Sequence, residues 1–356
     1  MPENLQRFYL TSYTSAGGPG IGAGHLSSGR PILDAWTSGV TDPSWVDVSA
    51  DHRTLYAISE IALGGLVNAL HIGDGGDLTV INRQHTGTKP AHVVVHPGGQ
   101  FLITSMYNGG SIALHRIGAD GSVGPICDAH LLAASDASEH SGPAARTSPQ
   151  ADHDAGHAHQ VVLDPTAEYL LAVDLGFDSV VTYRLDADAG RLTEFARTRF
   201  SAGSGPRHLI FHPRGRHAYL VNELDSTVTI CDWRNGALTA NRTTVTRPAA
   251  PGPNYPGEIV LAADGRFAYV SNRGDNSIAI FKIKDGGAGL ELLGVPSCGG
   301  DWPRHLAIDR TGSWLYAANE RSGDLTWFAI DPVSGLIGEV AGQLPVAGAA
   351  QLRLLD

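Results

Sequence analysis

The stretch GPRHLIFHPRGRHAYLVNEL, from Gly205 to Leu224, decides the fold, because similar stretches recur along the chain. It holds an apolar run, a turn rich in proline and glycine, a second apolar run and a final Asn-Glu pair. Residues aligned with Arg207 open six copies, at Ser44, Ala91, His159, Arg207, Gly257 and Arg304. The steps between these anchors are 47, 68, 48, 50 and 47 residues. A period of about 48 residues is typical of a β-propeller.

Each copy contains several short strands. In the copy that starts at Gly257, an Ala-Asp-Gly turn at 263–265 precedes the apolar run Phe267–Val270, and Ser277–Phe281 follows after a polar turn. Short β-rich runs separated by Pro-Gly, Asp-Gly and Asn-Gly turns predict hairpins. Helical periodicity is absent over any long window. Each copy therefore predicts one antiparallel blade of three or four strands.

The two ends of the sequence complete the count of blades. Residues Phe8–Tyr13 resemble the second strand of a copy, whereas Ala350–Leu354 begin 46 residues after Arg304 and resemble a first strand. We expect the two segments to share one blade, which closes the ring and removes its open edges. The prediction is an all-β, seven-bladed β-propeller that forms a single domain over residues 1–356.

Composition limits the partners and the compartment. The net charge of −11 argues against a nucleic-acid partner, which requires a basic surface. No apolar run approaches the roughly 20 residues that span a membrane, and the first residues lack the pattern of a secretory signal. Three unclustered cysteines, Cys127, Cys231 and Cys298, fit a reducing cytoplasm and match no metal-site spacing. Composition leaves the oligomeric state open.

The repeat predicts where polar side chains meet. An anchor opens the first strand of its blade, and the residue 16 positions later closes the second strand, so both lie at the same end of the central channel. This places His159, Arg207, Glu223 and Arg273 around one funnel as candidate catalytic residues. Arginines beside an acid favour an anionic ligand held by charge-assisted hydrogen bonds. The candidate substrate-binding residues are Arg304, Glu320, Glu60, Tyr107, Asp174 and Asn222.

A structural interpretation competes with the functional one. Propellers place polar residues around a channel that water fills. Duplication of a blade also copies a residue with a purely structural role into every repeat. His208 and His305 follow directly after two anchors, so strand alternation predicts that they point away from the channel. We expect these two histidines to hold turns or to pack inside a blade.

Five stretches resemble a known family: HAHQVVLDP (157–165), VDLGFDSVVTY (173–183), GPRHLIFHPRGRHAYLVNEL (205–224), DGRFAYVSNRGDNSIAIF (264–281) and PRHLAIDRTGSWLYAANE (303–320). They look like the seven-bladed lactonase family, which groups propeller-type 6-phosphogluconolactonases with fungal 3-carboxy-cis,cis-muconate lactonizing enzymes. The muconate enzymes carry a histidine, two arginines and a glutamate as proposed active-site residues. Their motifs match His159, Arg207, Glu223 and Arg273, so the resemblance implies a catalytic role for the same four residues.

The resemblance leaves the reaction open between lactone hydrolysis and lactone closure. The segment Asp174–Asp178 looks more like the phosphogluconolactonase branch. An insertion at about 133–156, rich in Ala, Ser, His and Asp, accounts for the 68-residue step. It enters the funnel face just before His159, so we expect it to influence substrate choice.

Hydrolysis of an anionic sugar lactone without a cofactor is the first hypothesis. Arg207 or Arg273 would stabilise the oxyanion, and Glu223 or His159 would take the proton from water. The remaining arginine and Arg304 would bind a phosphate or a carboxylate. A cyclising enzyme of the carboxymuconate type would use the same groups on carboxylate substrates.

Two further hypotheses remain. A metal-dependent lactonase would use the cluster of Asp152, His153, Asp154, His157 and His159, because zinc ligands often are closely spaced histidines. A non-catalytic binding scaffold is the other, because propellers are common platforms and the fold alone implies no activity. A nucleophilic triad is unsupported, since the sequence contains no Gly-x-Ser-x-Gly motif.

Overall fold

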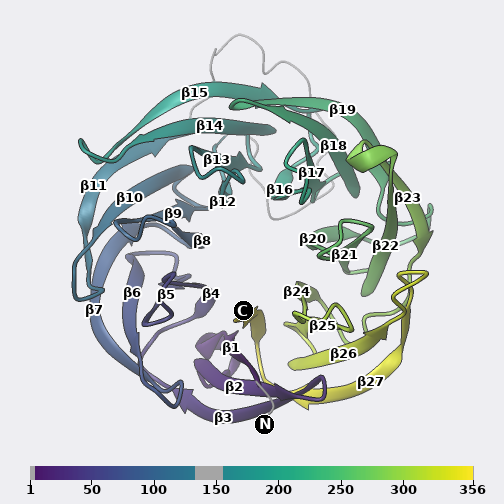
Figure 1. The fold of residues 1–356 in the computed structure, drawn as a ribbon, viewed down its shortest axis with the longest axis horizontal. Helices are drawn as coiled ribbons and strands as arrows, with labels where there is room; N and C mark the ends of the chain where they lie inside the picture. Colours follow the sequence, from purple (N-terminus) through teal and green to yellow (C-terminus); the bar gives the residue numbers. More distant parts are fainter. Residues whose placement is uncertain (1–4, 133–154, 356) are drawn as a thin grey trace.

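A computed structural model describes residues 5–132 and 155–355 and shows seven four-stranded antiparallel sheets around one axis (Figure 1). The prediction of a seven-bladed propeller is confirmed. We name the blades A to G. Blade A has the strand order β28-β1-β2-β3, and blades B to G each take four consecutive strands from β4–β7 to β24–β27. Of the insertion at about 133–156, residues 133–154 lie outside the described residues.

The strands fall into four concentric sets. The innermost strands are β28 (Ala349–Leu354), β4 (Pro43–Val48), β8 (Pro90–Val95), β12 (Ala158–Leu163), β16 (Pro206–Phe211), β20 (Tyr255–Leu261) and β24 (Pro303–Ile308). The second strands are β1 (Gln6–Ser12), β5 (Thr54–Ser59), β9 (Phe101–Met106), β13 (Tyr169–Asp174), β17 (His217–Asn222), β21 (Phe267–Arg273) and β25 (Trp314–Asn319).

The third strands are β2 (Ile21–Ser27), β6 (Gly65–Ile72), β10 (Ser111–Ile117), β14 (Ser179–Asp186), β18 (Thr227–Arg234), β22 (Ser277–Lys284) and β26 (Asp324–Ile330). The outer strands are β3 (Arg30–Thr37), β7 (Leu78–Gly87), β11 (Val123–Leu131), β15 (Arg191–Arg199), β19 (Ala237–Val245), β23 (Gly289–Gly294) and β27 (Ile337–Pro345). Two single-turn 3-10 helices complete the described elements, at Thr14–Ala16 and Asp285–Gly287. No helix in this part of the chain has the length and apolar character that a bilayer crossing requires.

The hydrophobic core lies between neighbouring blades. On β17, Ala218 and Leu220 pack in a cluster with residues of blade D, whereas Tyr219 and Val221 pack in a cluster with residues of blade F. This is the two-residue alternation of a strand that is buried on both faces. Each blade therefore needs both neighbours, as in other repeat proteins.

Blade A closes the ring as the sequence predicts. Strand β28 pairs antiparallel with β1, and the register places Leu354 opposite Phe8 and Leu352 opposite Leu10. Phe8, Leu10 and Leu352 share a core cluster with residues of blade G. Gln351 also accepts a hydrogen bond from the Val46 amide of blade B, at 2.6 Å. The C-terminal strand thus joins three blades.

Every innermost strand carries one extra residue at its start. On β16, Pro206 lies opposite Asn222 and His208 opposite Val221, so Arg207 has no partner residue on β17. The same one-residue bulge occurs in the other six blades, between Pro43 and Val46, Pro90 and His92, Ala158 and Gln160, Pro256 and Ile259, Pro303 and His305, and Ala349 and Gln351. A bulge redirects the side chains on both sides of it. The anchors of the repeat are the bulged residues.

Removing residues 349–356 should destabilise the ring. The deletion opens the edge of β1 and exposes the partners of Leu352, which include residues of blade G. We expect the Tm to fall by several degrees or more, measured by circular dichroism, with new oligomers in size-exclusion chromatography. Removing Asp356 alone is the control and should leave the Tm unchanged. An unchanged Tm after the longer deletion would show that β28 does not hold the ring closed.

Candidate active site

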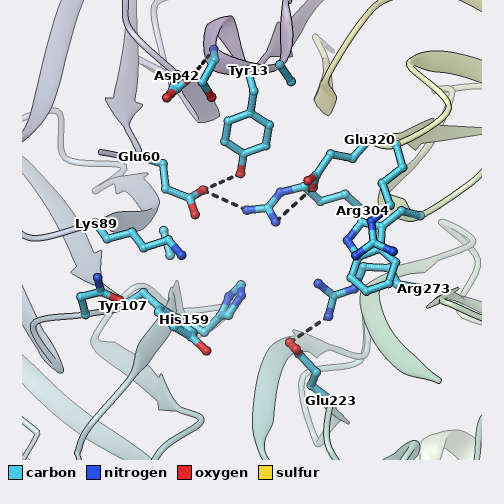
Figure 2. A pocket seen from close by; sticks show the side chains of 16 residues that line it. Tyr13, Asp42, Glu60, Lys89, Tyr107, His159, Glu223, Arg273, Arg304 and Glu320 are labelled. Atoms are coloured by element: carbon cyan, nitrogen blue, oxygen red, sulfur yellow. Dashed lines mark hydrogen bonds and ion pairs between the residues drawn. The ribbon is translucent and has the colours of Figure 1, made fainter. Parts of the chain in front are cut away.

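A cavity of about 460 Å³ opens at one mouth of the central channel, and all seven blades contribute to it (Figure 2). Its walls come from the starts of innermost strands, the ends of second strands and the loops beside them. The lining residues are Tyr13, Ser15, Ala16, Asp42, Glu60, Lys89, Ala91, Tyr107, Asn108, His159, Glu223, Arg273, Trp302, Arg304, Glu320 and Arg321. We call this space the funnel cavity.

Glu223 holds two arginines at the base of the funnel cavity. Its Oε2 atom lies 2.8 Å from Nη2 of Arg273 and 3.3 Å from Nε of Arg207. Arg207 also donates from Nη1 to the Gly257 carbonyl at 2.7 Å. Burial, followed by the charge of Arg273, lowers the pKa of Arg207 to about 9, so its guanidinium remains charged at neutral pH. One carboxylate thus sits between two buried cations.

Arg304 forms the second charged cluster, on the opposite side of the cavity from Glu223 (Figure 2). Its Nη2 lies 3.0 Å from Oε2 of Glu60, and its Nη1 lies 3.6 Å from Oε2 of Glu320. The Tyr13 hydroxyl donates to the same Glu60 oxygen at 2.6 Å. Burial works against the charge of Arg304, but Tyr13, Glu60 and Glu320 outweigh it and raise the pKa of this arginine. Arg304 is therefore already engaged by two carboxylates.

His159 stands at the floor of the funnel cavity as a neutral imidazole. Burial, followed by the charge of Arg207, holds the pKa of His159 well below its usual range. Its ring lies edge-on to Tyr107, with the centroids 5.8 Å apart. The Nδ1 atom is buried and has no hydrogen-bond partner among the described residues. A neutral imidazole has a lone pair that can accept a proton, and the surrounding arginines oppose the positive charge that results.

Two cations in the cavity wall have no carboxylate partner within the described ranges. Lys89 places its Nζ atom 5.2 Å from the Tyr107 ring centre, and the Arg321 guanidinium lies 3.3 Å from the Trp302 ring centre. Cation–π contacts orient these groups without neutralising them. Their charge remains available for an anion.

The structure brings most of the predicted residues together. His159, Glu223, Arg273, Arg304, Glu320, Glu60 and Tyr107 line the funnel cavity. Arg207 lies directly beneath it, only 1% exposed, against Glu223. It is therefore a buried residue and not a rim residue. Their catalytic and binding roles stay predictions.

Asp174 and Asn222 do not line the cavity. Asp174 accepts hydrogen bonds from the amides of His157 and Gly176, and burial raises its pKa to about 6. Asn222 donates to Thr227 and Thr229 of its own blade. Both side chains hold the loop that follows a second strand.

The expectation for His208 and His305 is wrong. His208 contacts His159 of blade D, His92 of blade C and Glu258 of blade F, so it points to the axis. His305 contacts Trp45 of blade B. The bulge at the anchor is the reason, because the extra residue cancels the alternation and turns two successive side chains toward the channel.

Sequence reasoning missed Asp42, Lys89 and Trp302, each two positions before an anchor. All three line the cavity and have positive φ angles of 43°, 48° and 68°. Positive φ is uncommon outside glycine and is strained for a bulky residue such as tryptophan. Such strain is typical of functional sites. Comparing this third position across the repeats would have found the three residues, and the residue after Glu320 would have added Arg321.

The proposed metal cluster is only partly described. Asp152, His153 and Asp154 lie outside the described residues. His157 donates from Nδ1 to the Tyr107 carbonyl at 2.9 Å, and its ring stacks on Tyr107 with centroids 4.6 Å apart. Within residues 5–132 and 155–355, no group of three or more His, Cys, Asp or Glu side chains is placed to hold a metal ion.

The shared carboxylate predicts an order of stability losses. Glu223→Ala leaves Arg207 and Arg273 buried without the acid between them, so we expect the free energy of unfolding to fall by about 3–5 kcal/mol. Arg207→Met leaves Glu223 paired with Arg273 and should cost less. Urea unfolding at pH 7, followed by tryptophan fluorescence, measures both. A larger loss for Arg207→Met would show that Glu223 is not the residue that holds this cluster together.

Comparisons with known proteins agree with this geometry. A family model described as "Lactonase, 7-bladed beta-propeller" matches residues 7–353. The chain is 32% identical over 335 residues to a 6-phosphogluconolactonase of Bacillus subtilis, covering 92% of each protein. A solved periplasmic gluconolactonase of Pseudomonas aeruginosa is 29% identical with a TM-score of 0.89, covering 99% of each chain. A solved Lactobacillus plantarum protein is 30% identical with a TM-score of 0.88, covering 99% of this chain and 100% of that one. The chain belongs to the family of seven-bladed β-propeller lactonases.

Proposed function

We propose that this protein hydrolyses an anionic sugar lactone of the 6-phosphogluconolactone type in the funnel cavity, using its own side chains. One observation carries the proposal: a neutral histidine faces the same space as an arginine with free donors and two cations without a carboxylate partner among the described residues. These are the three parts that the hydrolysis of a charged lactone requires. The Bacillus subtilis relative, described as a 6-phosphogluconolactonase, supports the substrate class.

His159 suits the role of general base better than Glu223 does. The Glu223 carboxylate is shared by Arg207 and Arg273, so its Oε2 atom is already engaged by two guanidinium groups. His159 is neutral and lines the cavity. An anionic substrate would offset the arginines that disfavour its protonation. Glu223 then serves to hold the two arginines in place.

Arg273 suits the role of oxyanion donor. Its Nε donates to the Tyr255 carbonyl at 3.0 Å. Its Nη2 donates to the Pro256 carbonyl and forms an ion pair with Glu223. A guanidinium has five N–H donors, and the two on Nη1, which have no hydrogen-bond partner in the part of the chain that the structure describes, remain for a ligand. Fixed donors that face a developing negative charge are usually a large part of catalysis.

The chemical step then balances with these residues alone. Water attacks the lactone carbonyl carbon while His159 takes one of its protons, and Arg273 stabilises the oxyanion. The ring C–O bond breaks as the carbonyl reforms, and the proton on His159 passes to the departing alkoxide. The products are the open hydroxy acid and the neutral histidine, ready for another turnover.

Three other interpretations remain outcomes of the test. Lactone closure on a carboxylated diene would use the same cations, and a scaffold would bind without turnover. We favour catalysis without a metal ion because Glu60, Glu223 and Glu320 are each held by arginine. A cytoplasmic location fits the three unpaired cysteines, although the Pseudomonas aeruginosa neighbour is described as periplasmic.

Acid release from purified protein tests the function. We expect turnover of 6-phosphogluconolactone at pH 7 above its spontaneous hydrolysis, unchanged after dialysis against EDTA. His159→Asn should lower kcat by about 10²-fold or more with a smaller change in KM. His115→Asn is the matched control, because His115 is a buried histidine held by Thr86 and Gly124 within the blades. A greater loss of kcat in Glu223→Gln would make Glu223 the base, and loss of activity in EDTA would favour a metal.

Lys89 and Arg321 should select for the phosphate. We expect Lys89→Met and Arg321→Met to lower the ratio of kcat/KM for 6-phosphogluconolactone to that for gluconolactone by about 10-fold each, the size of one lost charge-assisted contact. Lys282→Met removes the same charge from an exposed site on β22 and should leave the ratio unchanged. An unchanged ratio in both cavity variants would place the phosphate elsewhere, with Arg304 as the next candidate.

A further inference from the structure

A second layer of side chains fills the channel beneath the funnel cavity. It consists of the residue after each anchor, because the bulge turns both residues toward the axis. We call it the lower layer, and its members are Trp45, His92, Gln160, His208, Glu258, His305 and Gln351. All but His208 also line a cavity of about 490 Å³ that opens at the opposite mouth. The proposed reaction does not use any of them.

Glu258 is the acid of the lower layer, and two histidines face it. Both of its carboxylate oxygens lie 3.1 Å from Nδ1 of His208, and Oε2 lies 3.6 Å from Nε2 of His305. The Ile259 amide donates to Oε1 at 3.0 Å. Glu258 is 6% exposed, so a charge at this position depends on these few partners.

His208 links Glu258 to His159. The centroids of the His208 and His159 rings are 5.1 Å apart, and the two ring planes are inclined at 68°. The Nε2 atom of His208 and the Nδ1 atom of His159 are both buried, and neither has a hydrogen-bond partner among the described residues. Buried polar atoms are normally paired, directly or through an ordered water. Two such atoms on neighbouring rings are natural partners for one bridging water molecule.

The charge of Glu258 determines which ring nitrogens of His208 and His159 carry a proton. Burial raises the pKa of Glu258, and the charges of His305 and Arg207 act against that shift. In its charged form the carboxylate only accepts, so His208 then donates its Nδ1–H to Glu258, which leaves the Nε2 of His208 as an acceptor. That acceptor suits a donor on Nδ1 of His159. The remaining Nε2 of His159 then holds the lone pair with which a general base would face the funnel cavity.

We infer that Glu258 and His208 form a positioning relay that sets the tautomer of His159 and stabilises its protonated form during catalysis. The inference rests on the proposed role of His159 as the base. His208 passes its hydrogen bond to His159 through one water molecule, because no direct hydrogen bond joins the two rings in the structure. Glu258 and His208 touch no substrate and are positioning residues.

Charge makes such a relay necessary. The charged and titratable groups around His159 are Tyr107 of blade C, Arg207 and His208 of blade E, Arg273 of blade F and Arg304 of blade G. The three arginines oppose a positive charge on the imidazole. Glu223 already forms ion pairs with two of them, Arg207 and Arg273. Glu258 approaches from the other side of His208 and supplies the negative charge that offsets an imidazolium at His159.

Nitrogen-15 NMR of the histidine rings tests the relay without any substrate. We expect both His159 and His208 to carry the proton on Nδ1 at neutral pH, which is the less common tautomer of free imidazole. The assignments come from the His159→Asn and His208→Asn spectra. A proton on Nε2 of His159 in the wild-type protein would overturn the inference. Because this arm needs no turnover, its result stands even if no lactone is hydrolysed and the proposed function fails.

Kinetics of Glu258→Gln test the role of the charge. The glutamine still accepts a hydrogen bond from His208, but we expect kcat to fall about 10-fold or more with KM nearly unchanged. The ascending limb of the kcat/KM profile against pH should move to lower pH, because His159 becomes harder to protonate. Glu258→Asp retains the charge and should restore part of the rate.

His115→Gln is the matched control. His115 is a buried histidine held by Thr86 and Gly124, and it lies outside the lower layer. We expect its kcat and its pH profile to stay within about 3-fold and 0.3 pH units of the wild type, since no link of the relay is removed. Equal losses in His115→Gln and Glu258→Gln, or an unmoved limb in Glu258→Gln with a native Tm, would reduce Glu258 to a structural residue.

Discussion

The bulge at the start of each innermost strand is the constraint on which the rest of the site depends. A regular strand would send Arg207 and His208 to opposite faces, and only one of them would reach the channel. The extra residue brings both to the axis. Proline precedes the bulged residue on β4, β8, β16, β20 and β24. Proline lacks the amide that a regular ladder would use, which suits it to this position.

Sevenfold repetition turns this local irregularity into two chemically different layers. The anchors and the residues at the ends of the second strands supply His159, arginines and acids to the funnel cavity. The residues after the anchors supply Trp45, three histidines and Glu258 to the lower layer. No single blade provides all the groups at either level. The ring closure by β28 therefore stabilises the site as well as the fold, because it fixes the distances between blades.

The sequence predicts the fold and much of the site for the same physical reason. Residues one repeat apart occupy equal places in successive blades, so matching positions meet at the axis. His159, Arg207, Glu223 and Arg273 were found in this way, and they lie together. The errors have a physical cause too. The bulge inverts the expected direction of His208 and His305, and the sequence marks it only by the proline that precedes it in five of the seven innermost strands.

Asp174 and Asn222 show a second limit of repeat reasoning. They are the last residues of β13 and β17, and the equivalent residues Asn272 and Asn319 donate to side chains of the third strand in the same way as Asn222. A polar residue that recurs in every blade can therefore have a structural role, which is to hold the turn between two strands. Lys89 and Trp302 differ from these asparagines, because glycine would adopt their positive φ angles with less strain. The turn alone therefore does not explain why lysine and tryptophan occupy these positions.

The distribution of charge explains why these exceptions gather at one mouth. The protein carries a net charge of −11, yet the funnel cavity collects Lys89, Arg273, Arg304 and Arg321 above the buried Arg207. Burying guanidinium groups costs desolvation energy, which shared carboxylates only partly offset. A stable ring of blades can carry that cost, together with the strain of three left-handed residues. The cations and His159 compete for the same acids, so a second acid below the histidine is what allows a proton acceptor to work among arginines.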